Sequence, residues 1–144
     1  MARTRRFLPL AILVVALPLA ACSQESAAAA PDPPAAVEEI AGSELSRITL
    51  TDRAIERLDI QTASVERRGA KSTVPYAAVI YASDGTTWTY TSPEANVFVR
   101  AEVVVDRIDG ETALLSSGPP AGTTVVTLGA AELYGTETGV GGGH

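Results

Sequence analysis

The chain has 144 residues, with 17 acidic and 11 basic side chains, and its net charge is −6. A chain of this length has room for one small domain and flanking segments. Its acidity excludes the electrostatic attraction to phosphates on which nucleic-acid binding depends, so no nucleic-acid partner is expected. Its single cysteine excludes an internal disulfide.

The first segment of the chain has the three parts of a secretory signal peptide. Arg3, Arg5 and Arg6 form a positive flank, and fifteen uncharged, mostly apolar residues follow at positions 7–21. A transmembrane helix needs about 20 apolar residues, so this segment is too short to span a bilayer. We therefore predict that residues 1–21 are a signal peptide that is removed on export.

Four residues at the end of this segment, Leu19-Ala20-Ala21-Cys22, resemble the lipobox of bacterial lipoproteins. The resemblance implies that the Cys22 thiol receives a diacylglyceryl group and that cleavage makes Cys22 the mature N-terminus. One acyl chain holds a protein only marginally at a membrane, whereas two or more hold it stably. The alternative is an ordinary signal peptide followed by a free or buried thiol.

A linker is predicted between the signal peptide and the folded domain. Without residues 1–21 the chain has 8 basic and 17 acidic residues, so its charge is −9 and anionic lipid surfaces repel it. The lipid on Cys22 must therefore anchor the chain to the membrane. Residues 22–46 are rich in alanine, proline, serine and glutamate, without a periodic apolar face. We predict that they form a lipidated, disordered linker.

The folded domain is predicted at residues 47–134. Residues 48–50 alternate between apolar and polar side chains, as in a short strand. Thr51 is suited to cap a helix of about two turns. The apolar residues of this helix recur at helical spacing: Ala54, Ile55 and Leu58. Residues 60–65 are predicted to be extended again.

The rest of the domain has a series of β signals separated by turns. The predicted strands are residues 73–82, 86–91, 97–105, 112–116 and 124–128. Turn residues separate them at 83–85, 93–96, 109–110 and 118–122. This spacing predicts a mainly β fold, a small antiparallel barrel or sandwich with one short helix. Residues 135–144 are rich in glycine and are predicted to form a flexible tail.

Few residues are available for catalysis, which needs a nucleophile with a base, a metal site or a cofactor loop. The only histidine is His144, in the tail, and the only thiol is that of Cys22. We therefore predict no enzyme, no catalytic residue, no cofactor and no metal site. Two acidic groupings are the alternatives: Asp106, Asp109 and Glu111 around a hard cation, and Asp52 with Glu56 as an acid–base pair. The first lacks the regular ligand spacing of a calcium loop, and the second is typical of a solvated helix face.

The aromatic residues form the other notable group. Trp88 and Tyr90 are predicted on one face of their strand, and Tyr76 and Tyr81 precede them along the chain. Such a stripe usually belongs to a core or to cross-strand packing. The alternative is an exposed aromatic patch for a partner or ligand.

Five short motifs follow one another along the domain. They are Val74-Pro75-Tyr76-Ala77-Ala78-Val79, Gly85 with Trp88-Thr89-Tyr90, and residues 98–103, 117–126 and 129–133. In this order they resemble the C-terminal, membrane-proximal domain of periplasmic adaptor subunits. These are the membrane-fusion proteins of resistance-nodulation-division and related efflux pumps. Residues 48–65 resemble the segment before the central domains of such adaptors, so the resemblance covers residues 47–134.

The resemblance implies a domain that is built by segments from both ends of the chain and that docks against the external face of an export transporter. Eight residues between Val65 and Val74 stand where full adaptors carry a lipoyl-like domain, a barrel and usually a helical hairpin. Without those parts the chain is not expected to bridge two membranes. We expect a lipid-anchored accessory subunit in the cell envelope, on the extracytoplasmic face of the plasma membrane. The alternative is a stand-alone ligand-binding or envelope-structural lipoprotein, whose apolar cleft would be lined by Trp88 and a tyrosine.

Overall fold

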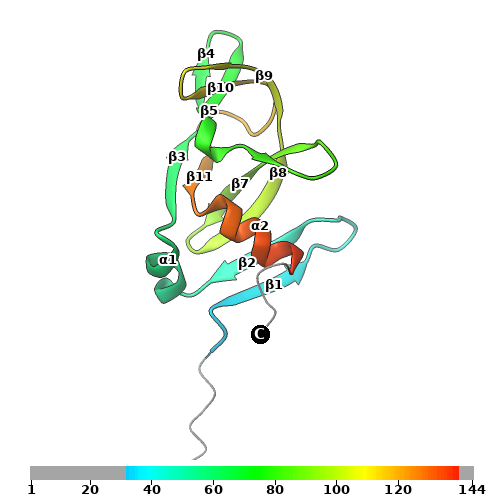
Figure 1. The fold of residues 1–144 in the computed structure, drawn as a ribbon, viewed down its shortest axis with the longest axis vertical. Helices are drawn as coiled ribbons and strands as arrows, with labels where there is room; N and C mark the ends of the chain where they lie inside the picture. The colour runs from blue at the N-terminus through cyan, green and yellow to red at the C-terminus, as the bar shows by residue number, and fades with distance from the viewer. Residues whose placement is uncertain (1–31, 140–144) are drawn as a thin grey trace, which may run out of the picture. The chain divides into compact units, whose positions relative to one another are not determined.

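The computed structural model describes residues 32–139, and Figure 1 shows their fold. The predictions made for residues 1–31 and 140–144, which include the signal peptide, Cys22 and His144, lie outside the described residues. Within residues 32–139, no helix has the length and apolar character needed to cross a membrane.

The described residues form two antiparallel sheets. The large sheet has the strand order β1 (Ala35–Glu39), β2 (Ser46–Leu50), β8 (Val97–Glu102), β7 (Thr87–Glu94), β11 (Thr124–Leu128) and β3 (Gln61–Ser64), with β6 (Ile80–Tyr81) also paired to β7. The small sheet has the order β4 (Glu66–Arg68), β5 (Lys71–Pro75), β10 (Thr112–Ser117) and β9 (Val104–Asp109). The helices are α1 (Asp52–Leu58) and α2 (Ala130–Thr138), and Tyr76–Ala78 forms one 3-10 turn, η1.

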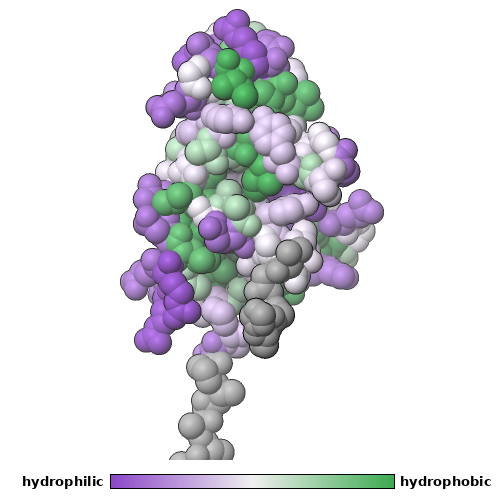
Figure 2. All heavy atoms as spheres, in the orientation of Figure 1, coloured by the Kyte–Doolittle hydropathy of each residue, from purple (hydrophilic) through white to green (hydrophobic). Residues whose placement is uncertain are grey.

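This architecture confirms the predicted mainly β fold. The strands of residues 32–139 make two sandwich-like sheets rather than one closed barrel. The β4–β5 hairpin lies at the opposite end of the domain from α1 and β1 (Figure 1). Figure 2 shows hydrophilic side chains concentrated at both of these ends.

The predicted short helix is confirmed as α1, together with its cap. The Thr51 hydroxyl accepts a hydrogen bond from the Ala54 backbone N–H at 3.2 Å, which satisfies one free donor of the first turn. The negative charge of Asp52 in that turn stabilises the helix, because it lies near the positive end of the helix dipole. Asp59 ends the helix in the left-handed conformation, with φ 48°.

The run at 97–105 was predicted as one strand, and this prediction is wrong in one respect. The chain leaves the large sheet at Val103 and continues as β9 in the small sheet. The Val103 N–H still bonds to the Thr87 carbonyl at 2.9 Å, and its side chain is buried in the core beneath the small sheet. Phe98, earlier in the same run, belongs instead to the core of the large sheet, so the run contributes to both cores.

The predicted strand at 73–82 is also interrupted. It ends as β5 at Pro75, turns through η1, and resumes only as the two-residue β6. The Tyr76 N–H bonds to the Glu111 carbonyl at 2.7 Å, so the small sheet holds the start of the turn. Ala78 is fully buried in the second core, and this burial fixes the turn against the sheets.

Two hydrophobic cores hold the domain. The core of the large sheet consists of Ile48, Leu50, Ala54, Tyr90, Phe98, Val126, Ala130 and Leu133. The core of the small sheet consists of Val65, Val74, Ala78, Val103, Ala113, Leu115 and Val125. Val125 and Val126 are adjacent in β11 and enter different cores, because successive side chains of a strand point to opposite faces.

The linker prediction for residues 22–46 is wrong from Ala35 onwards. Strand β1 pairs with β2 over its full length, so that Ala35 lies opposite Leu50 and Glu39 opposite Ser46. The strand is largely exposed and therefore has no periodic apolar face for sequence reasoning to detect. Its backbone hydrogen bonds to β2 stabilise it instead.

The tail prediction for residues 135–144 is wrong up to Thr138, because α2 continues to that residue. Leu133 is fully buried, and Gly129 begins the helix with φ 86°. A Cβ at Gly129 would lie 2.2 Å from the Ile60 Cδ1 atom, so the glycine also permits close packing on the chain after α1. The fold therefore has a second helix in addition to the one predicted.

Candidate functional site

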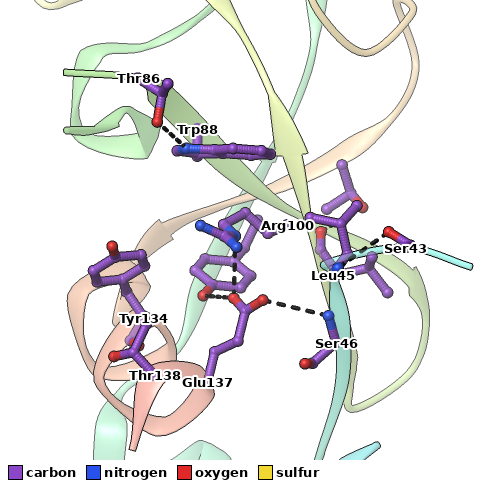
Figure 3. A network of polar contacts seen from close by, with 12 residues as sticks. Ser43, Leu45, Ser46, Thr86, Trp88, Arg100, Tyr134, Glu137 and Thr138 are labelled. Carbon is purple, nitrogen blue, oxygen red and sulfur yellow. Dashed lines mark hydrogen bonds and ion pairs between the residues drawn. The ribbon is translucent and has the colours of Figure 1, made fainter. Parts of the chain in front are cut away.

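The most buried charged group of the domain is Glu137, near the end of α2. Only 4% of its side chain is exposed. Its carboxylate accepts hydrogen bonds from the Tyr90 hydroxyl and, at 3.4 Å, from the Ser46 backbone N–H. The Arg100 Nε atom lies 3.3 Å from the same carboxylate but is not aligned for a hydrogen bond, so this contact is an ion pair. We call Ser46, Tyr90, Arg100 and Glu137 the Glu137 cluster (Figure 3).

Aromatic rings enclose the arginine of this cluster. The Arg100 guanidinium carbon lies 4.2 Å from the centroid of the Trp88 ring and 5.7 Å from that of Tyr134. Both distances are within the range of cation–π attraction. The Trp88 ring N–H donates to the Thr86 hydroxyl at 2.7 Å, and this hydroxyl donates to Asp84 at 2.6 Å. Polar contacts thus run from the turn before β7 to α2 (Figure 3).

Burial and hydrogen bonds shift the pKa values of Tyr90 and Asp84 in this network. Burial, together with the hydrogen bond to Glu137, raises the pKa of the Tyr90 hydroxyl, so Tyr90 remains a donor. Hydrogen bonds from Thr86 lower the pKa of the Asp84 carboxyl, so Asp84 remains an acceptor. Each functional group is occupied by a neighbour, so the cluster fastens α2 to the large sheet.

Sequence reasoning missed Glu137, because this residue falls in the segment predicted as a tail. A signal for it exists. Ala130, Leu133 and Glu137 are three and four positions apart, which is the spacing of one helix face. The glycines that follow from Gly139 obscured this pattern.

The structure separates the acidic residues that were considered as cation ligands. Asp106 pairs with the Lys71 ammonium, and Asp109 pairs with the Arg68 guanidinium at 3.0 Å. Within residues 32–139, no group of three or more His, Cys, Asp or Glu residues is arranged to hold a metal ion. The Arg68–Asp109 pair instead links β4 to β9, the two outer strands of the small sheet.

The second acidic grouping is also divided. Asp52 accepts a hydrogen bond from the Asn96 side chain, which connects the first turn of α1 to the turn between β7 and β8. Asn96 has a positive φ of 62°, a conformation that asparagine tolerates better than most residues. Asp52 therefore has a structural contact, while Glu56 is exposed on the helix.

The four aromatic residues differ in exposure. Tyr90 is fully buried, and Trp88 is partly buried against Arg100. Tyr76 and Tyr81 are 40% and 55% exposed, and their rings meet edge to face with centroids 6.5 Å apart. The exposed aromatic surface of the domain therefore lies at η1 and β6.

Two hollows lie beside this aromatic pair. One has a volume of about 360 Å³ and is lined by residues of β3, β4, β5 and β10, among them Ser64, Glu66 and Thr112. The other has a volume of about 380 Å³ and is lined by Tyr76, Ala77 and Gly110. Pro75 and Glu111 line both, so the two hollows adjoin each other. Trp88 lines neither of them.

These observations define a small antiparallel β domain with two sheets. The buried Glu137 cluster fastens α2 to the large sheet, and exposed carboxylates and tyrosines lie beside the two hollows. No protein family, no curated protein and no solved structure matches this chain.

Proposed function

We propose that this protein is an extracytoplasmic lipoprotein, anchored to the membrane by lipid on Cys22, and that it acts as a minimal adaptor-like accessory subunit of an efflux or export transporter. Its domain docks on the transporter through protein–protein contacts. The lipid keeps the domain at the membrane surface, where the partner lies.

The observation that carries this proposal is the way in which the large sheet is assembled. Strands β2 and β3 come from before the β4–β5 hairpin, and β7, β8 and β11 come from after it. The membrane-proximal domain that the sequence resembles is likewise built by segments from both ends of its chain. The β4–β5 hairpin occupies the chain position at which full adaptors carry their lipoyl-like, barrel and hairpin parts.

The length of chain between the lipid and the domain supports docking close to the membrane. With β1 in the domain, about ten residues separate Cys22 from Asp32, and they reach at most about 35 Å. A partner contacted by this domain must therefore be near the same membrane. A transporter in that membrane meets this requirement.

Replacement of the lipidated cysteine tests the anchor and the partner together. In Cys22→Ser, the chain should leave the membrane fraction, and a transporter subunit that co-purifies with the full chain in mild detergent should be lost. Ser26→Ala is the matched control and should change neither result. Recovery of the full chain from membranes without any transporter subunit contradicts docking and supports the envelope-structural alternative.

The ligand-binding alternative receives no support from the geometry around Trp88. It requires an apolar cleft lined by Trp88 and a tyrosine, whereas one face of the ring carries Arg100 and the ring N–H is bonded to Thr86. We therefore do not propose a small-molecule site there.

A further inference from the structure

The edge of β3 that faces away from β11 has no paired strand and lies beside the hollow lined by Ser64 and Glu66. Among the described residues, β3 pairs only with β11. The Val65 N–H bonds to the Thr123 carbonyl at 2.8 Å, so the backbone groups of Val65 point to the β11 side. Because these directions alternate along an antiparallel strand, the N–H and C=O groups of Thr62 and Ser64 point away from β11, to the side on which β5 ends at Pro75.

The other outer strands differ from β3. In the small sheet, the exposed Arg68–Asp109 pair links β4 to β9. In the large sheet, a smaller hollow of about 190 Å³ lies beside β1, and its lining carries Arg57 and no acidic side chain. An unpaired strand edge and a hollow with acidic side chains therefore coincide at β3.

Two carboxylates give this surface a negative charge. Glu66 and Glu111 are both exposed and both line the hollow. Neither forms an ion pair with another of the residues 32–139, whereas nearby Asp106 and Asp109 are paired with Lys71 and Arg68. The hollow thus retains two charges that a basic partner can neutralise.

The adjoining hollow adds the exposed tyrosines. Tyr76 lines this second hollow, and Tyr81 contacts the Tyr76 ring edge to face. A lysine or arginine side chain gains from contact with an aromatic face, in addition to its attraction to a carboxylate. The surface from β3 to Tyr76 therefore offers three kinds of contact, namely backbone donors and acceptors, carboxylates and tyrosine rings.

We propose that the strip formed by the unpaired edge of β3, Glu66, Glu111 and Tyr76 is the docking surface for an extended, basic segment of a partner protein. The segment adds to the large sheet beside β3 through backbone hydrogen bonds, and its basic side chains meet the two carboxylates. The strand edge favours a polypeptide over a small cation, because only a backbone matches its alternating donors and acceptors. This inference rests on the proposed function and names its contact surface.

Binding of a labelled peptide in which lysine alternates with threonine tests the strip, measured by fluorescence anisotropy with the full chain. Glu66→Gln combined with Glu111→Gln should weaken binding about three- to tenfold, as expected for two partly exposed charge contacts. The matched control, Glu38→Gln with Glu39→Gln, removes the same charge from β1 and should leave the affinity within about twofold. Equal weakening by both pairs overturns the proposal, because the attraction would then be unspecific.

A second probe tests the strand addition itself without altering the protein. The same peptide, N-methylated along one backbone edge, keeps its charges and loses those hydrogen-bond donors. Loss of binding supports addition to β3. Undiminished binding, or displacement of the parent peptide by tetramethylammonium at similar concentration, overturns it in favour of a small-cation site.

Co-purification separates a failure of this inference from a failure of the proposed function. If a transporter subunit co-purifies equally with the full chain and with the Glu66→Gln, Glu111→Gln variant, the strip is not its docking surface and the proposed function stands. If the peptide binds as described and no transporter subunit is recovered, the strip is supported and the proposed function fails.

Discussion

The two sheets of this domain use charged side chains in opposite ways. At the large sheet, Glu137 of α2 and Arg100 of β8 are 4% and 14% exposed and contact Tyr90 and Trp88. In the small sheet, the side chains of the Arg68–Asp109 pair are 56% and 59% exposed. A buried pair is costly to break, because the remaining partner stays desolvated, whereas an exposed pair is replaced by water. The comparison indicates that the stability of the large sheet depends on Glu137 of α2. Loss of a charge from the Arg68–Asp109 pair of the small sheet should have little effect on stability.

Removal of the Glu137 carboxylate is expected to have the largest effect. Glu137→Ala leaves Arg100 and the Tyr90 hydroxyl without their buried partner and should lower the free energy of unfolding by about 3–5 kcal/mol. Equilibrium unfolding in urea, followed by the fluorescence of Trp88, measures it.

Two variants serve as controls for Glu137→Ala. Glu132→Ala changes an exposed acid on the same helix and should cost less than about 1 kcal/mol. Asp109→Ala breaks the exposed pair of the small sheet and should cost about 0.2–1 kcal/mol, with less effect at high salt. If Asp109→Ala costs as much as Glu137→Ala, the contrast between the sheets is wrong.

A pair of glycine variants tests the close packing of α2. Gly129 and Gly122 have positive φ values of 86° and 91°, so alanine is strained at both positions, by about 1–2 kcal/mol. Only at Gly129 does an added Cβ meet another side chain, that of Ile60. Gly129→Ala should therefore lower the free energy of unfolding by about 1–3 kcal/mol more than Gly122→Ala does. A lower melting temperature for Gly129→Ala than for Gly122→Ala would show this difference. Equal losses would show that α2 does not rest on the chain after α1.

The smallest expected effect concerns the acid side of the pH profile. The Thr86 hydrogen bonds hold the pKa of Asp84 below its ordinary value of 3.8. A lowered pKa in the folded state stabilises the fold above the ordinary value, and this contribution is lost as the pH falls through the folded pKa. Thr86→Val should raise the pKa of Asp84 toward 3.8, as measured by carboxyl-carbon NMR titration.

Thr49→Val, at an exposed threonine of β2, is the control for this titration and should leave the Asp84 pKa unchanged. An unchanged pKa in Thr86→Val contradicts the assigned hydrogen bonds.

Local signals account for the parts of the fold that sequence reasoning predicted. Thr51 caps α1 through a contact three residues away, and β11 has the predicted bounds of 124–128. The parts that were missed depend on distant partners. Glu137 meets Tyr90, which is 47 positions earlier, and β1 has only its pairing with β2 to indicate a strand.

The candidate docking strip was predictable only in outline. Docking of the domain on a partner was predicted, and Tyr76 belongs to the aromatic group for which an exposed patch was the alternative interpretation. The strip itself joins Ser64, Glu66 and Glu111 from separate parts of the chain. Their proximity follows from the pairing of β5 with β4 and β10 and from the contact of β5 with β3, which no local pattern encodes.

The lipid anchor is the claim on which the proposed function depends most directly. Mass spectrometry of the full chain extracted from membranes measures it in one step. We predict that Cys22 is the first residue and that it carries a diacylglyceryl group. A processed chain with an unmodified Cys22 would contradict the account.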